Sequence, residues 1–147
     1  MKKILVTGAT GYVGGRLVRN LIEQGHQVRV FVRDTKKVTQ YSWANSVEVF
    51  AGDVRNYEEA RSALKGIDAA YYLLHSINSA TQFDQIEKEM AATFGKAASD
   101  SQVRQIVYLG GIANDTKTSR HLKSRTDTGV ELAKHGVPVL ELRAGII

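Results

Sequence analysis

Residues 7–14 read TGATGYVG and come directly after a short apolar run at residues 4–6. Three glycines stand at regular spacing in this stretch, at Gly8, Gly11 and Gly14. A short aliphatic run that is cut off by glycine is typical of a buried strand. The stretch therefore predicts a strand that ends in a tight turn and leads at once into a helix.

The residues after this turn have the period of a helix. Val13, Leu17 and Leu21 share one face, and Gly25 stands where such a helix would end. The next apolar run, at residues 28–32, predicts a second strand. These segments form a complete strand-helix-strand unit, which gives the glycine spacing a structural context.

The same alternation continues along the chain. Short β-branched runs predict six strands, at residues 4–6, 28–32, 47–50, 69–74, 105–109 and 137–142. Strands that alternate with helices are typical of a parallel sheet covered on both faces. The predicted fold is a doubly wound α/β domain, the Rossmann fold, with three αβα layers and strand order 3-2-1-4-5-6.

Three further helices are predicted. Asn56 and Glu59 have capping-box spacing, and Gly66 ends that short helix. A longer helix is predicted from about residue 81 to 99, and another from about 119 to 135. One face of the longer helix carries an apolar stripe, which we interpret as core and not as a cofactor contact. The stripe consists of Phe83, Ile86, Met90 and Ala97. Residues 35–46 predict a partial helix whose Trp43 packs on the sheet edge.

The glycines in the first turn point to a bound dinucleotide. A pyrophosphate is held by free backbone N–H groups at a helix N-terminus, and the backbone approaches it closely only where side chains are missing. One glycine would make the turn, one would admit the phosphates and one would let the helix pack on the strand. The candidate contacts here are Gly8, Thr10, Gly11, Tyr12, Val13 and Gly14. The alternative is a glycine-rich turn without a ligand.

Composition excludes several other functions. The chain has no cysteine, which removes disulfides and thiolate metal sites and favours a reducing, cytoplasmic location. Its net charge of +5 is scattered, without aromatic platforms, so nucleic-acid binding is not expected. No apolar run approaches the roughly 18 residues of a membrane span, and no metal site is predicted.

A second motif completes a resemblance to a known family. The glycine spacing, together with Gly-Asp-Val at residues 52–54, resembles the extended and atypical short-chain dehydrogenase/reductases, particularly the NmrA-like NAD(P)-binding group. The likeness extends over essentially the whole chain. It implies an oxidoreductase or epimerase-like enzyme that acts on an unknown small molecule, or alternatively a non-catalytic, dinucleotide-binding redox sensor.

The end of the second strand bears on the choice of cofactor. Arg33 stands at its tip, where a guanidinium can pair with a 2′-phosphate, and in the family such an arginine indicates NADP. Asp34 follows, about where a carboxylate would bind the ribose hydroxyls of NAD, although it could instead cap the next turn. The prediction is NADP, with NAD as the alternative.

Two other strand ends are expected beside the cofactor. In the family, residues at the positions of Asp53 and Val54 lie next to the adenine, although Asp53 could equally cap a turn. Leu74, His75 and Ser76 end the fourth strand on the carboxyl edge, where open parallel sheets bind ligands. They are expected on the nicotinamide-ribose side.

The catalytic residues of the family are replaced in this chain. Its Tyr-x-x-x-Lys pair corresponds here to His121 and Arg125, and its strand-end serine to residues 110–111, which are both glycine. Four-residue spacing keeps His121 and Arg125 on one helical face, so a histidine acid with an arginine ribose clamp is one interpretation. The other interpretation is that His121 is a surface histidine without a catalytic role. His75 is a second candidate for a catalytic histidine.

Residues 143–147 resemble the segment that, in extended reductases, leads into a substrate-binding region. The chain is therefore expected to be one NAD(P)-binding Rossmann domain, residues 1–147, that lacks most of that region. The outer edge of the last strand could also pair with a second copy, because unpaired edges favour association.

Overall fold

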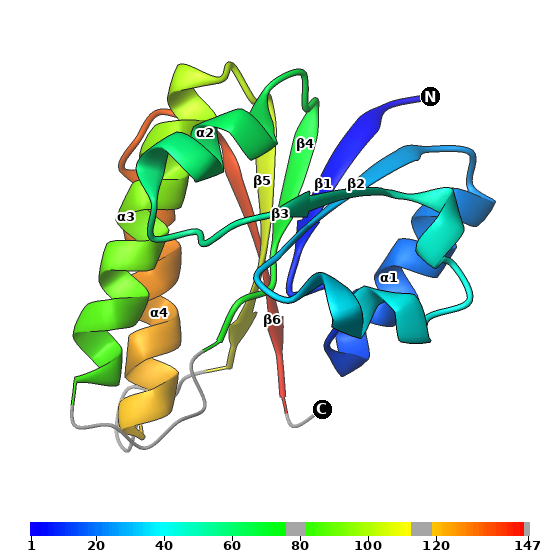
Figure 1. Ribbon diagram of the computed structural model, residues 1–147. Coiled ribbons are helices and arrows are strands. Elements are labelled where there is room, and N and C mark those ends of the chain that lie inside the picture. Colours follow the sequence, from blue (N-terminus) through cyan, green and yellow to red (C-terminus); the bar gives the residue numbers. More distant parts are fainter. Residues whose placement is uncertain (76–81, 113–118, 146–147) are drawn as a thin grey trace.

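The computed structural model describes residues 1–75, 82–112 and 119–145. Their centre is a parallel sheet of six strands in the order β3-β2-β1-β4-β5-β6 (Figure 1). The strands are β1 (Lys3–Thr7), β2 (Gln27–Val32), β3 (Glu48–Ala51), β4 (Ala69–Tyr72), β5 (Gln105–Gly111) and β6 (Val139–Ala144). The predicted fold class and strand order are confirmed.

Helices cover the two faces of the sheet unequally (Figure 1). They are α1 (Tyr12–Glu23), α2 (Tyr57–Leu64), α3 (Phe83–Asp100) and α4 (Arg120–Ala133). One face carries α2, α3 and α4, while the other carries α1 with two short 3-10 helices, Thr35–Gln40 and Ala44–Ser46. Within the described part of the chain, the α1 side of β6 has no helical cover, and Leu140 and Leu142 are about half exposed there.

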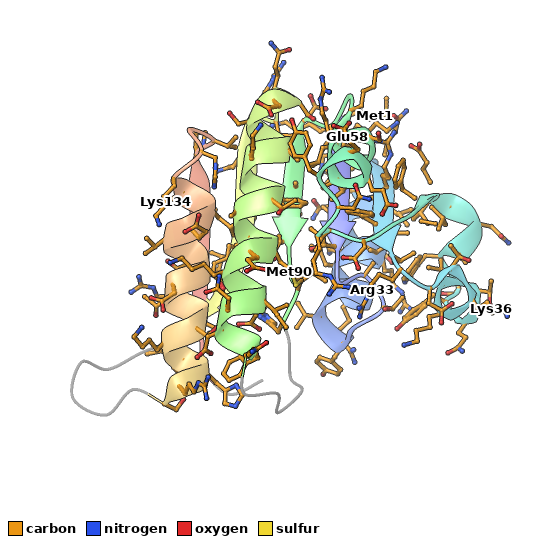
Figure 2. The ribbon with its side chains drawn as sticks, turned by 60° about the vertical axis from the view of Figure 1, so that its left-hand side comes forward. Met1, Arg33, Lys36, Glu58, Met90 and Lys134 are labelled. Carbon is orange, nitrogen blue, oxygen red and sulfur yellow. The ribbon has the colours of Figure 1, made fainter. Side chains whose placement is uncertain are left out.

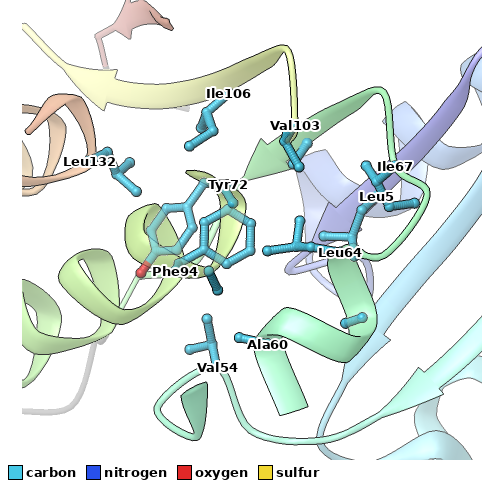
Figure 3. Packing of buried hydrophobic residues seen from close by; sticks show 14 of the residues in the cluster. Leu5, Val54, Ala60, Leu64, Ile67, Tyr72, Phe94, Val103, Ile106 and Leu132 are labelled. Atoms are coloured by element: carbon cyan, nitrogen blue, oxygen red, sulfur yellow. The ribbon is translucent and has the colours of Figure 1, made fainter. Parts of the chain in front are cut away.

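The larger core lies between the sheet and helices α2, α3 and α4 (Figure 3). Tyr72 of β4 packs its ring 5.0 Å from that of Phe94. Alanines on the sheet-facing side of α3 allow the helix to approach closely, and Ala91, Ala97 and Ala98 are fully buried. This packing fixes α3 beside the ends of β4 and β5.

Local signals in the sequence explain most element boundaries. The Asn56 side chain accepts from the Glu59 backbone N–H and starts α2, and the Ser119 hydroxyl accepts from Leu122 N–H and starts α4. Residues 35–46, for which the sequence predicts a partial helix, contain the two short 3-10 helices. Trp43 is buried between α1 and the β1–β2 side chains, and its ring stacks on Tyr41.

No helix among the described residues combines the length and apolar character that crossing a bilayer requires.

Candidate functional site

A cleft lies at the carboxyl edge of the sheet, where the chain turns outward from β1 on one side and β4 on the other. Its volume is about 820 Å³, within the usual range for small-molecule sites. Its lining residues come from five places: the glycine turn (Gly8, Thr10), the end of β2 (Phe31, Val32, Arg33, Asp34, Lys37), the end of β3 (Gly52, Asp53, Val54, Arg55), the end of β4 (Leu74, His75) and α3 (Phe83, Ile86, Met90).

The glycine turn is held in a conformation that two of its glycines require. Gly8 has φ of +66°, and a Cβ there would lie 2.8 Å from the Leu73 carbonyl oxygen. A Cβ on Gly14 would lie only 2.1 Å from the Gly8 carbonyl oxygen. Gly8 therefore makes the turn, and Gly14 allows α1 to begin directly against it.

Gly11 differs, because the protein itself places little against it. Among the described residues, a Cβ there would meet just one neighbour, the Gly8 carbonyl oxygen, at 3.3 Å. Gly11 is also the N-cap of α1, and it offers no side chain to accept from the first N–H groups. The first turn of α1 has no acidic residue. These free N–H groups and the open space beside them fit a pyrophosphate.

Two residues that the sequence analysis did not single out hold this turn in place. The Thr7 hydroxyl donates to the Tyr71 carbonyl (3.1 Å) and accepts from the Leu73 N–H (3.0 Å), which joins the ends of β1 and β4. The Tyr41 hydroxyl donates to the Thr10 carbonyl at 2.7 Å. Thr7 lies inside the motif and could have been considered, but the contact from Tyr41 gives no signal in the sequence.

The end of β2 presents positive charge to the cleft. Arg33 is exposed on the cleft wall, and Lys37 joins it from the following 3-10 helix. The Asp34 carboxylate instead accepts from the Lys36 backbone N–H at 3.0 Å and caps that helix. In the view of Figure 2, Arg33 lies between Met90 of α3, which lines the same cleft, and Lys36, which lies farther out at the edge of the molecule.

Asp53 lines the cleft but is also occupied locally. Its carboxylate accepts from the Arg55 backbone N–H (2.9 Å) and forms an ion pair with the Arg55 guanidinium (2.7 Å). The hydrogen bond from the Arg55 side chain holds the pKa of Asp53 below its ordinary value. The turn-capping role is thus seen directly. Val54 beside it is buried in the larger core and also reaches the cleft.

The interpretation of the α3 stripe as core alone is wrong. Ala97 and Phe83 are buried, but Phe83, Ile86 and Met90 line the cleft. Strand β4 ends at Tyr72, so the first half of α3 has no β4 strand to pack against. The inner face of this half of α3 lines the cleft instead. These residues give the cleft an apolar wall opposite Arg33.

His75 lies at the other end of the cleft. Its ring centroid is 6.5 Å from that of Tyr108, which is fully buried and donates its hydroxyl proton to the Arg125 carbonyl at 2.8 Å. Burial, aided by the positive charge of Arg125, lowers the pKa of His75 to about 4. The imidazole is therefore neutral at pH 7.

The pKa of His75 predicts a loss of stability in mild acid. Below its ordinary value of 6.5 the unfolded histidine takes up a proton, whereas the folded one stays neutral down to about 4. The free energy of unfolding should therefore fall as the pH drops through this window, by roughly 1 to 2 kcal/mol between pH 7 and pH 5. Urea unfolding at both pH values checks this. His75→Gln should show a smaller drop than wild type, and an equal drop would contradict the assignment.

The two residues at the family's catalytic positions lie near this end without lining the cleft. His121 is exposed, and its ring stacks on Phe83 with centroids 4.8 Å apart. Arg125, one turn later, is partly buried over Gly111 at the end of β5. Phe83 lines the cleft, whereas His121 contacts it only through this stacked ring pair. Ser76 lies outside the described residues.

The remaining site candidates belong to the glycine turn and the first turn of α1. Gly11, Tyr12, Val13 and Gly14 form the turn and the start of α1, outside the set that lines the cleft. Tyr12 is exposed, and the Arg16 guanidinium lies over its ring.

A second hollow of about 650 Å³ lies at the opposite edge of the sheet, and none of the predicted site residues lines it. No group suited to a metal ion occurs in residues 1–75, 82–112 and 119–145.

Solved structures share this fold over nearly the whole chain. Triphenylmethane reductase of Citrobacter sp., complexed with NADP(H), superposes with a TM-score of 0.83 at 24% identity, over 98% of this chain and 50% of that one. An NADPH-dependent quinone oxidoreductase of Escherichia coli, complexed with NADPH, gives 0.80 at 24% identity, over 95% and 48%. The chain spans about half the length of these proteins.

The curated relatives are matched over smaller shares of their own length than these solved structures. Sterol demethylase protein B of Methylococcus capsulatus is 41% identical over 68 residues, which cover 46% of this chain and 20% of the relative. The auxiliary protein GraX of Staphylococcus aureus is 26% identical over 129 residues, covering 82% and 40%. A family model described as NAD(P)H-binding matches residues 8–135, from the first glycine of the turn to the end of α4. The chain therefore belongs to the NAD(P)H-binding family.

Proposed function

We propose that this chain binds NADP(H) in preference to NAD(H) and forms the cofactor-binding half of an atypical short-chain reductase or epimerase-like enzyme that acts on a small organic substrate. The observation that carries the cofactor preference is the charge at the end of β2. Arg33 and Lys37 line the cleft there, while the Asp34 carboxylate caps the next helix.

The physical reason is the difference between the two dinucleotides. NADP carries a phosphate on the adenine ribose, and a guanidinium can donate two parallel hydrogen bonds to it. NAD would need a carboxylate that accepts from the ribose hydroxyls, but one oxygen of Asp34 is already used by Lys36 N–H. Two exposed cations that line the cleft beside an occupied carboxylate favour the phosphate.

The other cleft residues suggest how the rest of the cofactor would lie. The N–H groups of the glycine turn would bind the pyrophosphate, and Val54 with Met90 would provide an apolar surface for the adenine. His75 then lies at the nicotinamide end. When bound, the nicotinamide supplies hydride exchange, and this chain supplies the binding, the orientation and the exclusion of water.

The similar proteins support a reductase or an epimerase-like enzyme. Two of the similar structures are reductases whose complexes hold NADP(H) or NADPH. A UDP-glucose 4-epimerase of Rickettsia bellii is 34% identical over 79 residues. We also propose, from the family resemblance, that a further part of the protein contributes the substrate site. A cytoplasmic location and a homo-oligomer are likewise proposals.

Calorimetric titration with NADPH and NADH tests the cofactor preference. Wild type should bind NADPH about 10 to 100 times more tightly than NADH, because one or two charge-assisted hydrogen bonds are added. Arg33→Ala should lose most of this preference while its NADH affinity stays the same. Lys36→Ala is the matched control, because it removes a positive charge from the same segment at a side chain outside the cleft lining. Unchanged NADPH affinity in Arg33→Ala would overturn the assignment.

A non-catalytic redox sensor is the second candidate. It is favoured by the replacement of the family's Tyr-x-x-x-Lys pair with His121 and Arg125. Arginine cannot exchange a proton at neutral pH, and His121 stacks on Phe83 without lining the cleft itself. Oxidation of bound NADPH by simple quinones, measured as a loss of NADPH absorbance, would contradict this sensor.

A further inference from the structure

Arg125 occupies an unusual position at the carboxyl edge of the sheet. Its side chain crosses the end of β5, where a Cβ on Gly111 would lie 3.3 Å from the Arg125 Cδ and 3.4 Å from its Nη1. The residue is partly buried. Across the described residues, its guanidinium forms no ion pair. A cation held in place by packing, without a counter-ion, is available to an anionic ligand.

The neighbouring acidic and phenolic groups are already engaged. Glu87 of α3 accepts from the Ser124 hydroxyl, and Glu141 of β6 pairs with Arg143 at 3.4 Å. Burial raises the pKa of Tyr108 well above its ordinary value, and the Tyr108 hydroxyl donates a hydrogen bond to the Arg125 carbonyl. None of these groups forms an ion pair with the Arg125 guanidinium in the described part of the chain.

His75 connects this cation to the cofactor cleft. His75 lines the cleft, and its ring lies beside that of Tyr108. Tyr108 in turn donates a hydrogen bond to the backbone carbonyl of Arg125. The charge of Arg125 is close enough to act on the pKa of His75. A neutral imidazole offers one N–H donor and one acceptor, and so complements a charged ligand without adding a second charge.

We infer that Arg125, with His75 near it on the other side of Tyr108, forms a binding site for the carboxylate of an organic substrate next to the nicotinamide end of the cleft. The planar fork of a guanidinium matches the two oxygens of a carboxylate. This assignment rests on the proposed function for its location, and it makes Arg125 a substrate-binding residue instead of a ribose clamp. The substrate class is a small organic acid.

Benzoate is a simple probe for this site, and calorimetry measures its binding to the chain with and without saturating NADP⁺. Wild type should bind benzoate with a dissociation constant on the order of 1 mM. Arg125→Met keeps the apolar stem over Gly111 and should weaken benzoate binding at least tenfold, and Arg125→Lys should lie between the two. Lys123→Met is the matched control, because Lys123 is an exposed cation of the same helix that pairs with Asp127. It should leave benzoate binding unchanged.

The outcomes separate this inference from the cofactor proposal. No benzoate binding by wild type, or equal binding by Arg125→Met, overturns the carboxylate site. A tenfold or greater loss of NADP⁺ affinity in Arg125→Met, with benzoate unaffected, shows that Arg125 contacts the cofactor instead. If wild type fails to bind NADP⁺ but binds benzoate in an Arg125-dependent way, the proposed function fails while the anion site stands.

Discussion

Gly14→Ala is expected to abolish dinucleotide binding and to lower the free energy of unfolding by about 3 kcal/mol. The added Cβ would lie 2.1 Å from the Gly8 carbonyl oxygen and 2.8 Å from the Ala9 Cα, both backbone atoms. Neither can move away as a flexible side chain could. The start of α1 must therefore shift, and with it the N–H groups that face the cleft.

Gly11→Ala should behave in the opposite way. Its Cβ would have one close neighbour at 3.3 Å, so stability should change by less than about 0.5 kcal/mol. The methyl group would instead project into the space where we place the pyrophosphate. NADPH affinity should fall at least tenfold although the fold is intact.

Urea unfolding and calorimetric titration with NADPH, carried out on both variants, measure the two effects separately. The position-specific roles would be wrong if Gly11→Ala bound NADPH like wild type, since the open space would then have no ligand. They would also be wrong if Gly14→Ala were as stable as wild type. A control is Gly25→Ala, where a positive φ of 81° costs some stability far from the turn and nothing packs within 4 Å. It should leave NADPH affinity unchanged.

The sequence predicts the framework well because local physics decides it. Each buried strand is a short run of aliphatic residues, and the parallel pairing follows from the helices between the strands. Helix starts at Asn56 and Ser119 follow from side chains that cap their own backbone. The glycine motif predicts the turn because a positive φ at Gly8 and the close approach at Gly14 both require the missing side chain.

The parts that the sequence could not predict depend on distances in space. A helical stripe shows which face of α3 turns inward, but not that β4 ends at Tyr72, which leaves Ile86 and Met90 on the cleft. Asp34 had two possible roles, and the hydrogen bond from Lys36 N–H shows one of them. The contact from Tyr41 to Thr10 spans 31 residues and leaves no pattern. The roles of the cleft residues toward a cofactor stay predictions.

Arg29→Met is expected to lower the free energy of unfolding by about 2 to 3 kcal/mol, the largest effect predicted away from the cleft. Arg29 is a charged residue that stands between two valines of strand β2, and it is 7% exposed. Its Nη1 donates to the carbonyls of Ala63 and Lys65 at the end of α2, and its Nη2 pairs with Glu48 of β3 at 2.9 Å. Methionine fills similar space but leaves these carbonyls without a donor.

Glu48→Gln separates the ion pair from the contact with α2. Glu48 is about half exposed, so the loss of its charge should cost less than about 1 kcal/mol. Hydrogen bonds from Arg29 and then Lys3 lower the pKa of Glu48, so in Arg29→Met that pKa should rise, which NMR titration of the carboxyl can follow. If Glu48→Gln were as destabilising in urea as Arg29→Met, the surface ion pair would dominate. The smaller loss that we expect means that Arg29 acts mainly by satisfying the carbonyls at the carboxyl end of α2, and so anchors that helix against β2.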